Sequence, residues 1–122
     1  MGHEIEWDVF GVRCIYLGQC SYRDVEEALI EVNTSNAYKS LAYCLHDFTQ
    51  ATSLDSGLAV LITVGAHVLG GPSISPNWQT IIITTDDLFA SLVKAFSEDA
   101  QRPTHVCSSR QEADALALKL FE

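Results

Sequence analysis

Residues 40–61 read SLAYCLHDFTQATSLDSGLAVL, and this stretch decides the fold. Its first part is an apolar run that ends at Asp47, which is typical of a buried strand followed by a polar turn. An apolar segment then begins through Asp55, Ser56 and Gly57. Residues of this kind cap a helix, because the first backbone N–H groups of a helix have no partner within it and attract negative charge. The stretch therefore predicts a strand, a turn and a helix that begins near Ser56.

The order of elements around this stretch predicts an α/β fold. Strand-forming runs lie at residues 4–9, 12–17, 41–45, 79–83 and 104–107. A hydroxyl residue followed three positions later by an acid marks the start of a helix, and this spacing occurs at Ser21, Thr52, Thr84 and Ser109. The second of these helices is predicted over residues 57–69, before the Gly70-Gly71-Pro72 stop. The order β-β-α-β-α-β-α-β-α predicts a mixed, mainly parallel sheet of about five strands with four helices.

Length, charge and composition limit the classes of function. The 122 residues, 48% of them hydrophobic, predict a single domain over residues 1–122 with its own core. A net charge of −9 repels phosphate groups, so we expect no binding to nucleic acid or to anionic membranes. The longest apolar run, residues 57–69, is too short to span a membrane. The first residues carry no secretory signal, so we expect a cytoplasmic protein whose four cysteines are reduced and buried.

Four segments together resemble the STAS domain family, the anti-sigma factor antagonists typified by SpoIIAA. The second strand ends in Tyr16-Leu17-Gly18, as strands of that family end on glycine. The sequence DFT at residues 47–49 is similar to the family's Asp-Leu-Ser, and LDSGLAVL at residues 54–61 is similar to its Asp-Ser-Ser-Gly-Leu-Gly-Val-Leu. The sequence VCSSRQEA at residues 106–113 resembles the family's last strand and helix. The family's tandem serine is a single serine here.

This resemblance implies a non-catalytic regulatory module that binds a protein partner, such as a kinase-like anti-sigma factor. It also implies a switch by phosphorylation at the start of the second helix, with Ser56 as the candidate and Asp47, Thr49, Asp55 and Gly57 around it. A phosphate there adds about two negative charges. Helix capping alone also explains Asp55 and Ser56, so both interpretations stay open at this point.

The resemblance also allows an alternative, a carrier of a small hydrophobic ligand or lipid, as proposed for the looser SpoIIAA-like branch. The second predicted helix has little polar surface, and an exposed apolar face usually marks a partner, a ligand or a homodimer interface. The candidate apolar residues are Val60, Val64, Leu69, Phe89, Val93 and Phe96.

An enzyme built around His46 is the weakest of the three hypotheses. The four histidines are scattered, without metal-ligand spacing to a cysteine or to another histidine. The chain also lacks the Gly-x-Ser-x-Gly motif of a nucleophile elbow, and adjacent residues such as His46 and Asp47 point to opposite faces of a strand. We therefore expect no catalytic residue, no metal and no cofactor.

Overall fold

The computed structural model describes residues 2–8, 11–34, 43–54, 79–97 and 104–120. The predicted second helix over residues 57–69 lies outside these ranges. So do six of the candidate site residues, namely Asp55, Ser56, Gly57, Val60, Val64 and Leu69. Among the described residues, no helix has both the length and the apolar character needed to cross a membrane.

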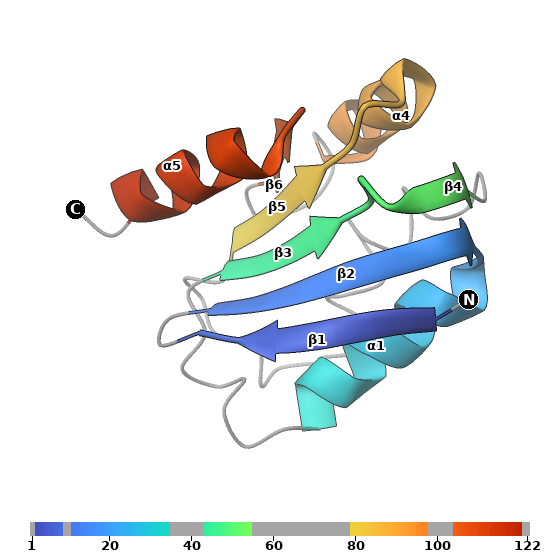
Figure 1. The fold of residues 1–122 in the computed structure, drawn as a ribbon. Helices are drawn as coiled ribbons and strands as arrows, with labels where there is room; N and C mark the ends of the chain where they lie inside the picture. Colours follow the sequence, from blue (N-terminus) through green and yellow to red (C-terminus); the bar gives the residue numbers. More distant parts are fainter. Residues whose placement is uncertain (1, 9–10, 35–42, 55–78, 98–103, 121–122) are drawn as a thin grey trace.

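The described strands form one mixed sheet, shown in Figure 1. They are β1 (Gly2–Trp7), β2 (Gly11–Cys20), β3 (Tyr43–Asp47), β4 (Ala51–Leu54), β5 (Gln79–Ile83) and β6 (Thr104–Cys107). The order across the sheet is β1-β2-β3-β5-β6, and β4 pairs with the end of β2. Only β1 and β2 are antiparallel to each other. The prediction of a mixed, mainly parallel sheet is thus confirmed, with six strands where about five were expected.

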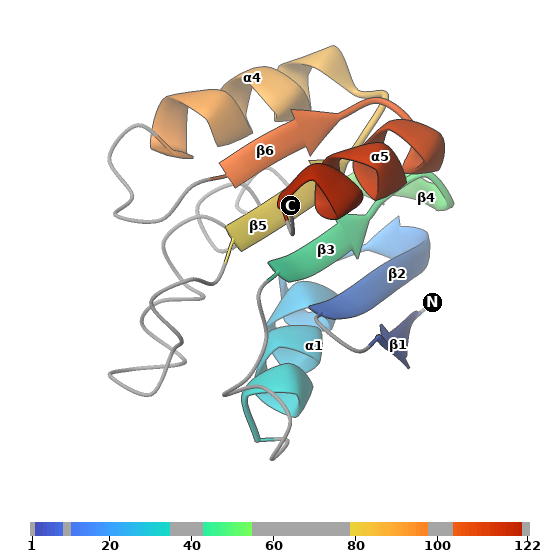
Figure 2. The same cartoon turned by 90° about the vertical axis from the view of Figure 1, so that its left-hand side faces the viewer.

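Three described helices cover the two faces of this sheet (Figure 2). They are α1 (Tyr22–Thr34), α4 (Asp87–Ser97) and α5 (Arg110–Leu120). Apolar residues of α1 and α4 pack on one face, and those of α5 pack on the other. Because side chains alternate along a strand, β3 sends Cys44 and His46 to the first face and Tyr43 and Leu45 to the second. All five residues of β3 are buried, as expected for a central strand.

Two of the predicted helix starts have the expected capping contacts. At the start of α1, the backbone N–H of Ser21 donates to Asp24 Oδ2 (2.9 Å), and the backbone N–H of Asp24 donates to Ser21 Oγ (3.3 Å). At the start of α5, the backbone N–H of Glu112 donates to Ser109 Oγ (3.2 Å). Local sequence patterns therefore place both helices correctly.

The predicted start at Thr84 is two residues early. The cap of α4 is Asp86, whose Oδ1 accepts a hydrogen bond from the backbone N–H of Phe89 (2.9 Å). Thr84 instead accepts a hydrogen bond through Oγ1 from the backbone N–H of Asp86 (3.1 Å). Thr84 thus shapes the turn that leads into the helix.

The predicted helix start at Thr52 is wrong, because residues 51–54 form the strand β4. This strand runs parallel to the end of β2, where the pairing shifts between Gly18 and Gln19. Gly18 has a φ of 68°, a backbone conformation that favours glycine, and its N–H donates to the carbonyl of Gln50 (3.2 Å). Gly18 pairs with Ala51 and Gln19 with Ser53, so the extra residue of this bulge is Thr52 in β4. Pairing with a distant strand has therefore overridden the local capping pattern.

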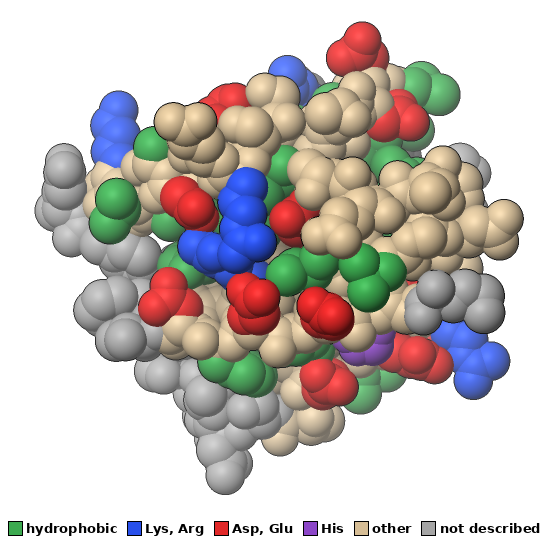
Figure 3. Space-filling model, in the orientation of Figure 1, with side chains coloured by type: hydrophobic (Ala, Val, Ile, Leu, Met, Phe, Trp, Pro, Cys, Tyr) green, Lys and Arg blue, Asp and Glu red, His purple; other side chains and the backbone are tan. Residues whose placement is uncertain are grey.

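Ion pairs tie α5 to the first two strands. Arg13 Nη2 lies 2.6 Å from Asp114 Oδ1, and Arg110 Nη2 lies 3.4 Å from Glu6 Oε2. Figure 3 shows basic side chains set among acidic ones on this face of the molecule. Arg13 and Arg110 are therefore each balanced by an acidic side chain.

Candidate functional site

The turn after β3 holds two of the predicted site residues together. Asp47 is only 3% exposed, and its Oδ1 accepts hydrogen bonds from the backbone N–H of Thr49 (2.9 Å) and from Thr49 Oγ1 (2.6 Å). A carboxylate that binds the backbone two residues ahead fixes the shape of a turn. Thr49 itself is exposed. Asp47 thus orders the turn from below, while Thr49 lies on the surface.

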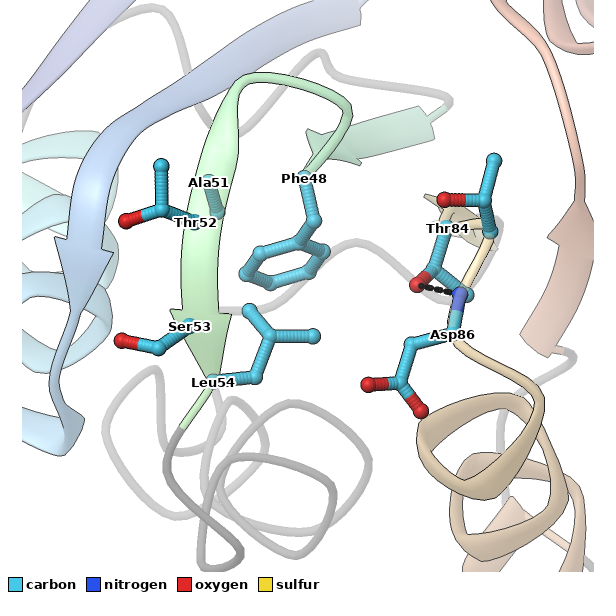
Figure 4. Close-up of a pocket in the computed structure, with 8 residues that line it drawn as sticks. Phe48, Ala51, Thr52, Ser53, Leu54, Thr84 and Asp86 are labelled. Atoms are coloured by element: carbon cyan, nitrogen blue, oxygen red, sulfur yellow. Dashed lines mark hydrogen bonds between the residues drawn. The ribbon is translucent and has the colours of Figure 1, made fainter.

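A pocket with many hydroxyl groups lies beside this turn, at the carboxyl ends of β3 and β5, and we call it the hydroxyl pocket (Figure 4). It has a volume of about 280 Å³ and is lined by Phe48, Ala51, Thr52, Ser53, Leu54, Thr84, Thr85 and Asp86. Phe48 and Leu54 contribute the apolar part, with Asp86 on the opposite wall in Figure 4. Carboxyl ends of parallel strands are common places for binding sites in α/β proteins.

One lining residue of the hydroxyl pocket lies next to the predicted phosphorylation site in the sequence. Leu54 is the last residue of β4, and Asp55 and Ser56 follow it directly in the sequence. The pocket's Thr84, Thr85 and Asp86 come from the segment between β5 and α4, which sequence reasoning treated only as a helix cap. The adjacency of β3 and β5 in the sheet brings this segment to the site.

Beneath the hydroxyl pocket lies a buried group of aromatic and sulfur-bearing side chains. Phe48 stacks on Tyr16 with ring centroids 4.7 Å apart, and the Tyr16 hydroxyl lies 2.8 Å from His46 Nδ1. Cys44 Sγ lies 3.5 Å from the other ring nitrogen, His46 Nε2. Burial lowers the pKa of His46 to about 4, so the imidazole is neutral at pH 7. His46 is 1% exposed and does not line the hydroxyl pocket.

Cys14 completes this group, and sequence reasoning missed it. One ligand atom from each of Cys14, Cys44 and His46 lies within 4.8 Å of the other two. Cys14 pairs in register with His46 on the neighbouring strand, and Cys44 lies two positions before His46 on the same face. The available signal was a Cys-x-His pair, Cys44 and His46, with Cys14 on the strand before it. Its use required knowledge of which strands are neighbours and in which register.

Of the apolar residues of α4 that were proposed to bind a ligand, two are buried in the core and one has a side chain that the structure does not describe. Phe89 is 3% exposed and Val93 is fully buried, and both pack in the core under α4. Phe96 belongs to α4, but its side chain lies outside what the structure describes. The described part of this candidate site is therefore packed against the sheet.

No protein-family model and no curated protein matches the chain. Among solved structures, the anti-sigma factor antagonist SpoIIAA in its unphosphorylated form matches with a TM-score of 0.67 at 12% identity, over 97% of this chain and 98% of that one. This chain has the SpoIIAA-like fold. Phosphorylated SpoIIAA of Bacillus matches over 94% of this chain and 99% of its own, with a TM-score of 0.61 at 12% identity.

A third similar structure is an uncharacterised protein of Shewanella loihica with a SpoIIAA-like fold. It has a TM-score of 0.60 and 14% identity, over 94% of this chain and 91% of its own. The predicted resemblance in fold is thus confirmed along nearly the whole chain. At such low identities, it is the fold that these SpoIIAA-like structures establish.

Proposed function

We propose that this protein is a non-catalytic regulatory module that binds a protein partner at the hydroxyl pocket and is switched by phosphorylation of Ser56. The observation that carries this proposal is the position of the hydroxyl pocket. The pocket lies at the end of the central strand, and its lining residue Leu54 directly precedes Asp55 and Ser56 in the sequence. SpoIIAA, which has the same fold, exists in an unphosphorylated and a phosphorylated form.

The chemistry of the hydroxyl pocket favours recognition of a polar protein surface. Exposed Thr52, Ser53 and Thr85 each donate and accept hydrogen bonds, and Asp86 adds a negative charge. The Asp47 contacts hold the turn at Thr49, so a partner meets a surface that is already ordered. A partner with basic or hydrogen-bonding groups fits this lining, and a kinase-like anti-sigma factor is the class we propose.

The same charges explain how a phosphate would act as a switch. Phosphorylation of Ser56 adds about two negative charges next to Asp55 in the sequence. Leu54, just before Asp55, lines the hydroxyl pocket, and Asp86 in the same lining already carries a negative charge. A partner that binds the unmodified surface would then face a more negative surface and would bind it with a different affinity. Thr49 is a second candidate, because its side chain is exposed, although its hydroxyl donates to Asp47.

The test combines mass spectrometry with affinity capture of the full chain from its native cells. We expect phosphate on Ser56 and a captured partner that binds wild-type protein and Ser56→Ala but is lost from Ser56→Asp. Ser91→Asp is the matched control, because it adds the same charge on an exposed position of α4 outside the pocket lining. Absence of phosphate on both Ser56 and Thr49, with equal binding by Ser56→Asp and Ser91→Asp, would contradict the proposal.

Cytoplasmic localisation belongs to this proposal, since the proposed kinase partner requires ATP. The apolar-ligand carrier and the homodimer stay predictions. A lipid-sized mass that co-purifies in native mass spectrometry would support the carrier, and a concentration-dependent dimer in sedimentation would support self-association.

A further inference from the structure

We propose that Cys14, Cys44 and His46 form a buried binding site for a thiophilic d10 metal ion, Zn²⁺ or Cu⁺. The site lies between β2 and β3, on the face covered by α1 and α4. It is independent of the proposed phosphorylation switch, because it uses none of the residues that line the hydroxyl pocket.

The geometry of the three side chains suits such an ion. With Zn–S and Zn–N bonds of about 2.3 and 2.0–2.1 Å and a tetrahedral angle, a sulfur and a nitrogen ligand lie roughly 3.6 Å apart. Cys44 Sγ and His46 Nε2 are already 3.5 Å apart. The remaining pairs of ligand atoms lie within 4.8 Å, so small side-chain rotations bring them to coordination distance.

Tyr16 supports the histidine in the manner of an outer-shell partner. Its hydroxyl lies 2.8 Å from His46 Nδ1. Its ring stacks on Phe48 and lies beside the imidazole, so that the three rings form one cluster. When Nδ1 carries the proton, its N–H donates a hydrogen bond to the tyrosine oxygen, and Nε2 presents its lone pair toward the two sulfurs. Tyr16 is fully buried, so this orientation is maintained by packing as well as by the hydrogen bond.

The ligand atoms select the class of ion. Two sulfurs and one imidazole nitrogen favour Zn²⁺ or Cu⁺ over Mg²⁺ and Ca²⁺, which prefer oxygen ligands. Binding releases one proton from each thiol, so two thiolates and a neutral imidazole carry a charge of −2. Zn²⁺ makes this group neutral, and Cu⁺ leaves one negative charge. A neutral group is less costly to bury, which favours Zn²⁺, whereas three ligand atoms suffice for Cu⁺ and leave Zn²⁺ one short of its usual four.

Burial also indicates when the ion would bind and what it would do. Cys14 and Cys44 are fully buried and His46 is 1% exposed, so the ion would enter as the chain folds. An ion in this place would cross-link β2 and β3 beneath Phe48, which forms part of the hydroxyl pocket. Its role would be structural, since no ligand atom is open to a substrate.

The test is to refold the full chain with Zn²⁺ or with Cu⁺ under reducing conditions, remove excess metal, and count bound ions by native mass spectrometry. We expect one ion per chain and a higher Tm than for protein refolded with a chelator. Cys14→Ala and Cys44→Ala should lose the ion. Cys107→Ala, which alters a buried cysteine on the opposite face of the sheet, should keep it.

Two further measurements keep the test decisive if an alanine variant fails to fold. Wild-type protein refolded with Co²⁺ should show a thiolate-to-cobalt charge-transfer band, and Tyr16→Phe should bind Zn²⁺ about 10–100-fold more weakly. Retention of either Zn²⁺ or Cu⁺ supports the site, and competition between the two identifies the preferred ion. No retained ion and no charge-transfer band would overturn the proposal, as would equal retention by Cys14→Ala and Cys107→Ala.

Discussion

The hydrogen bond between Tyr16 and His46 gives the sharpest prediction for stability. Tyr16→Phe removes one oxygen atom and keeps the ring that stacks on Phe48. His46 Nδ1 then loses its partner 2.8 Å away, and both residues are too buried for water to replace it. Since one buried nitrogen is left unpaired whichever tautomer the imidazole adopts, the variant should be clearly less stable than the wild type.

The size of the effect follows from the cost of an unpaired buried polar group, which is about 1–3 kcal/mol. For a domain of this size, that loss lowers Tm by roughly 3–6 °C per kcal/mol. Chemical denaturation in the presence of a chelator measures the free energy of unfolding without a contribution from bound metal. Tyr22→Phe is the matched control, because Tyr22 is 43% exposed and its change should stay within about 0.5 kcal/mol.

A double-mutant cycle separates the hydrogen bond from general packing. In a His46→Leu background, the Tyr16 hydroxyl no longer has the imidazole nitrogen 2.8 Å away, so Tyr16→Phe should there cost less than in the wild type. The coupling energy should be about 0.5–3 kcal/mol. The same cost for Tyr16→Phe in both backgrounds, or a cost equal to that of Tyr22→Phe, would refute the reasoning.

Two other predictions concern the place where Gly11 of β2 pairs with Tyr43 of β3. Gly11→Ala should destabilise the protein by about 1–3 kcal/mol in denaturant titrations, because the added Cβ would overlap the ring of Tyr43, and the same change in a Tyr43→Leu background should cost less. Burial and the hydrogen bond from its hydroxyl to Asp8 (2.8 Å) raise the pKa of Tyr43 to about 12. Because the pKa of Tyr43 is higher in the folded than in the unfolded protein, its neutral form contributes to the free energy of unfolding. This contribution is complete below the unfolded pKa of about 10 and is lost as pH rises toward 12. Unfolding free energies measured across this range should therefore fall less steeply for Tyr43→Phe than for the wild type, and identical slopes would contradict this assignment.

Features that depend on neighbours in sequence were predictable. The capping contacts of Ser21 with Asp24, and of Ser109 with Glu112, involve residues three positions apart. The strands β5 and β6 have the predicted bounds, since each is a short run of strand-forming residues between turn signals. Asp47 and Thr49, which the family resemblance grouped around Ser56, contact each other, because an aspartate can bind the backbone two residues ahead.

Features that depend on distant neighbours were not predictable. Residues 51–54 carry a capping pattern, and only the end of β2 beyond Gly18 makes them a strand. The hydroxyl pocket gains Thr84 and Asp86 because β5 lies beside β3, and Cys14 reaches His46 because β2 lies on the other side of β3. Neither adjacency nor register can be obtained from the periodicity of a single strand.

The central position of β3 has a consequence for biosynthesis. Its two partners, β2 and β5, lie roughly thirty residues before and after it in the chain, so both pairings are slow non-local events. During translation, β1, β2 and α1 emerge first, and β3 can join them while β5 has not yet been made. Until β5 arrives, one edge of an apolar strand stays open to strands of other nascent chains. Truncation or ribosome stalling before residue 79 should therefore promote aggregation.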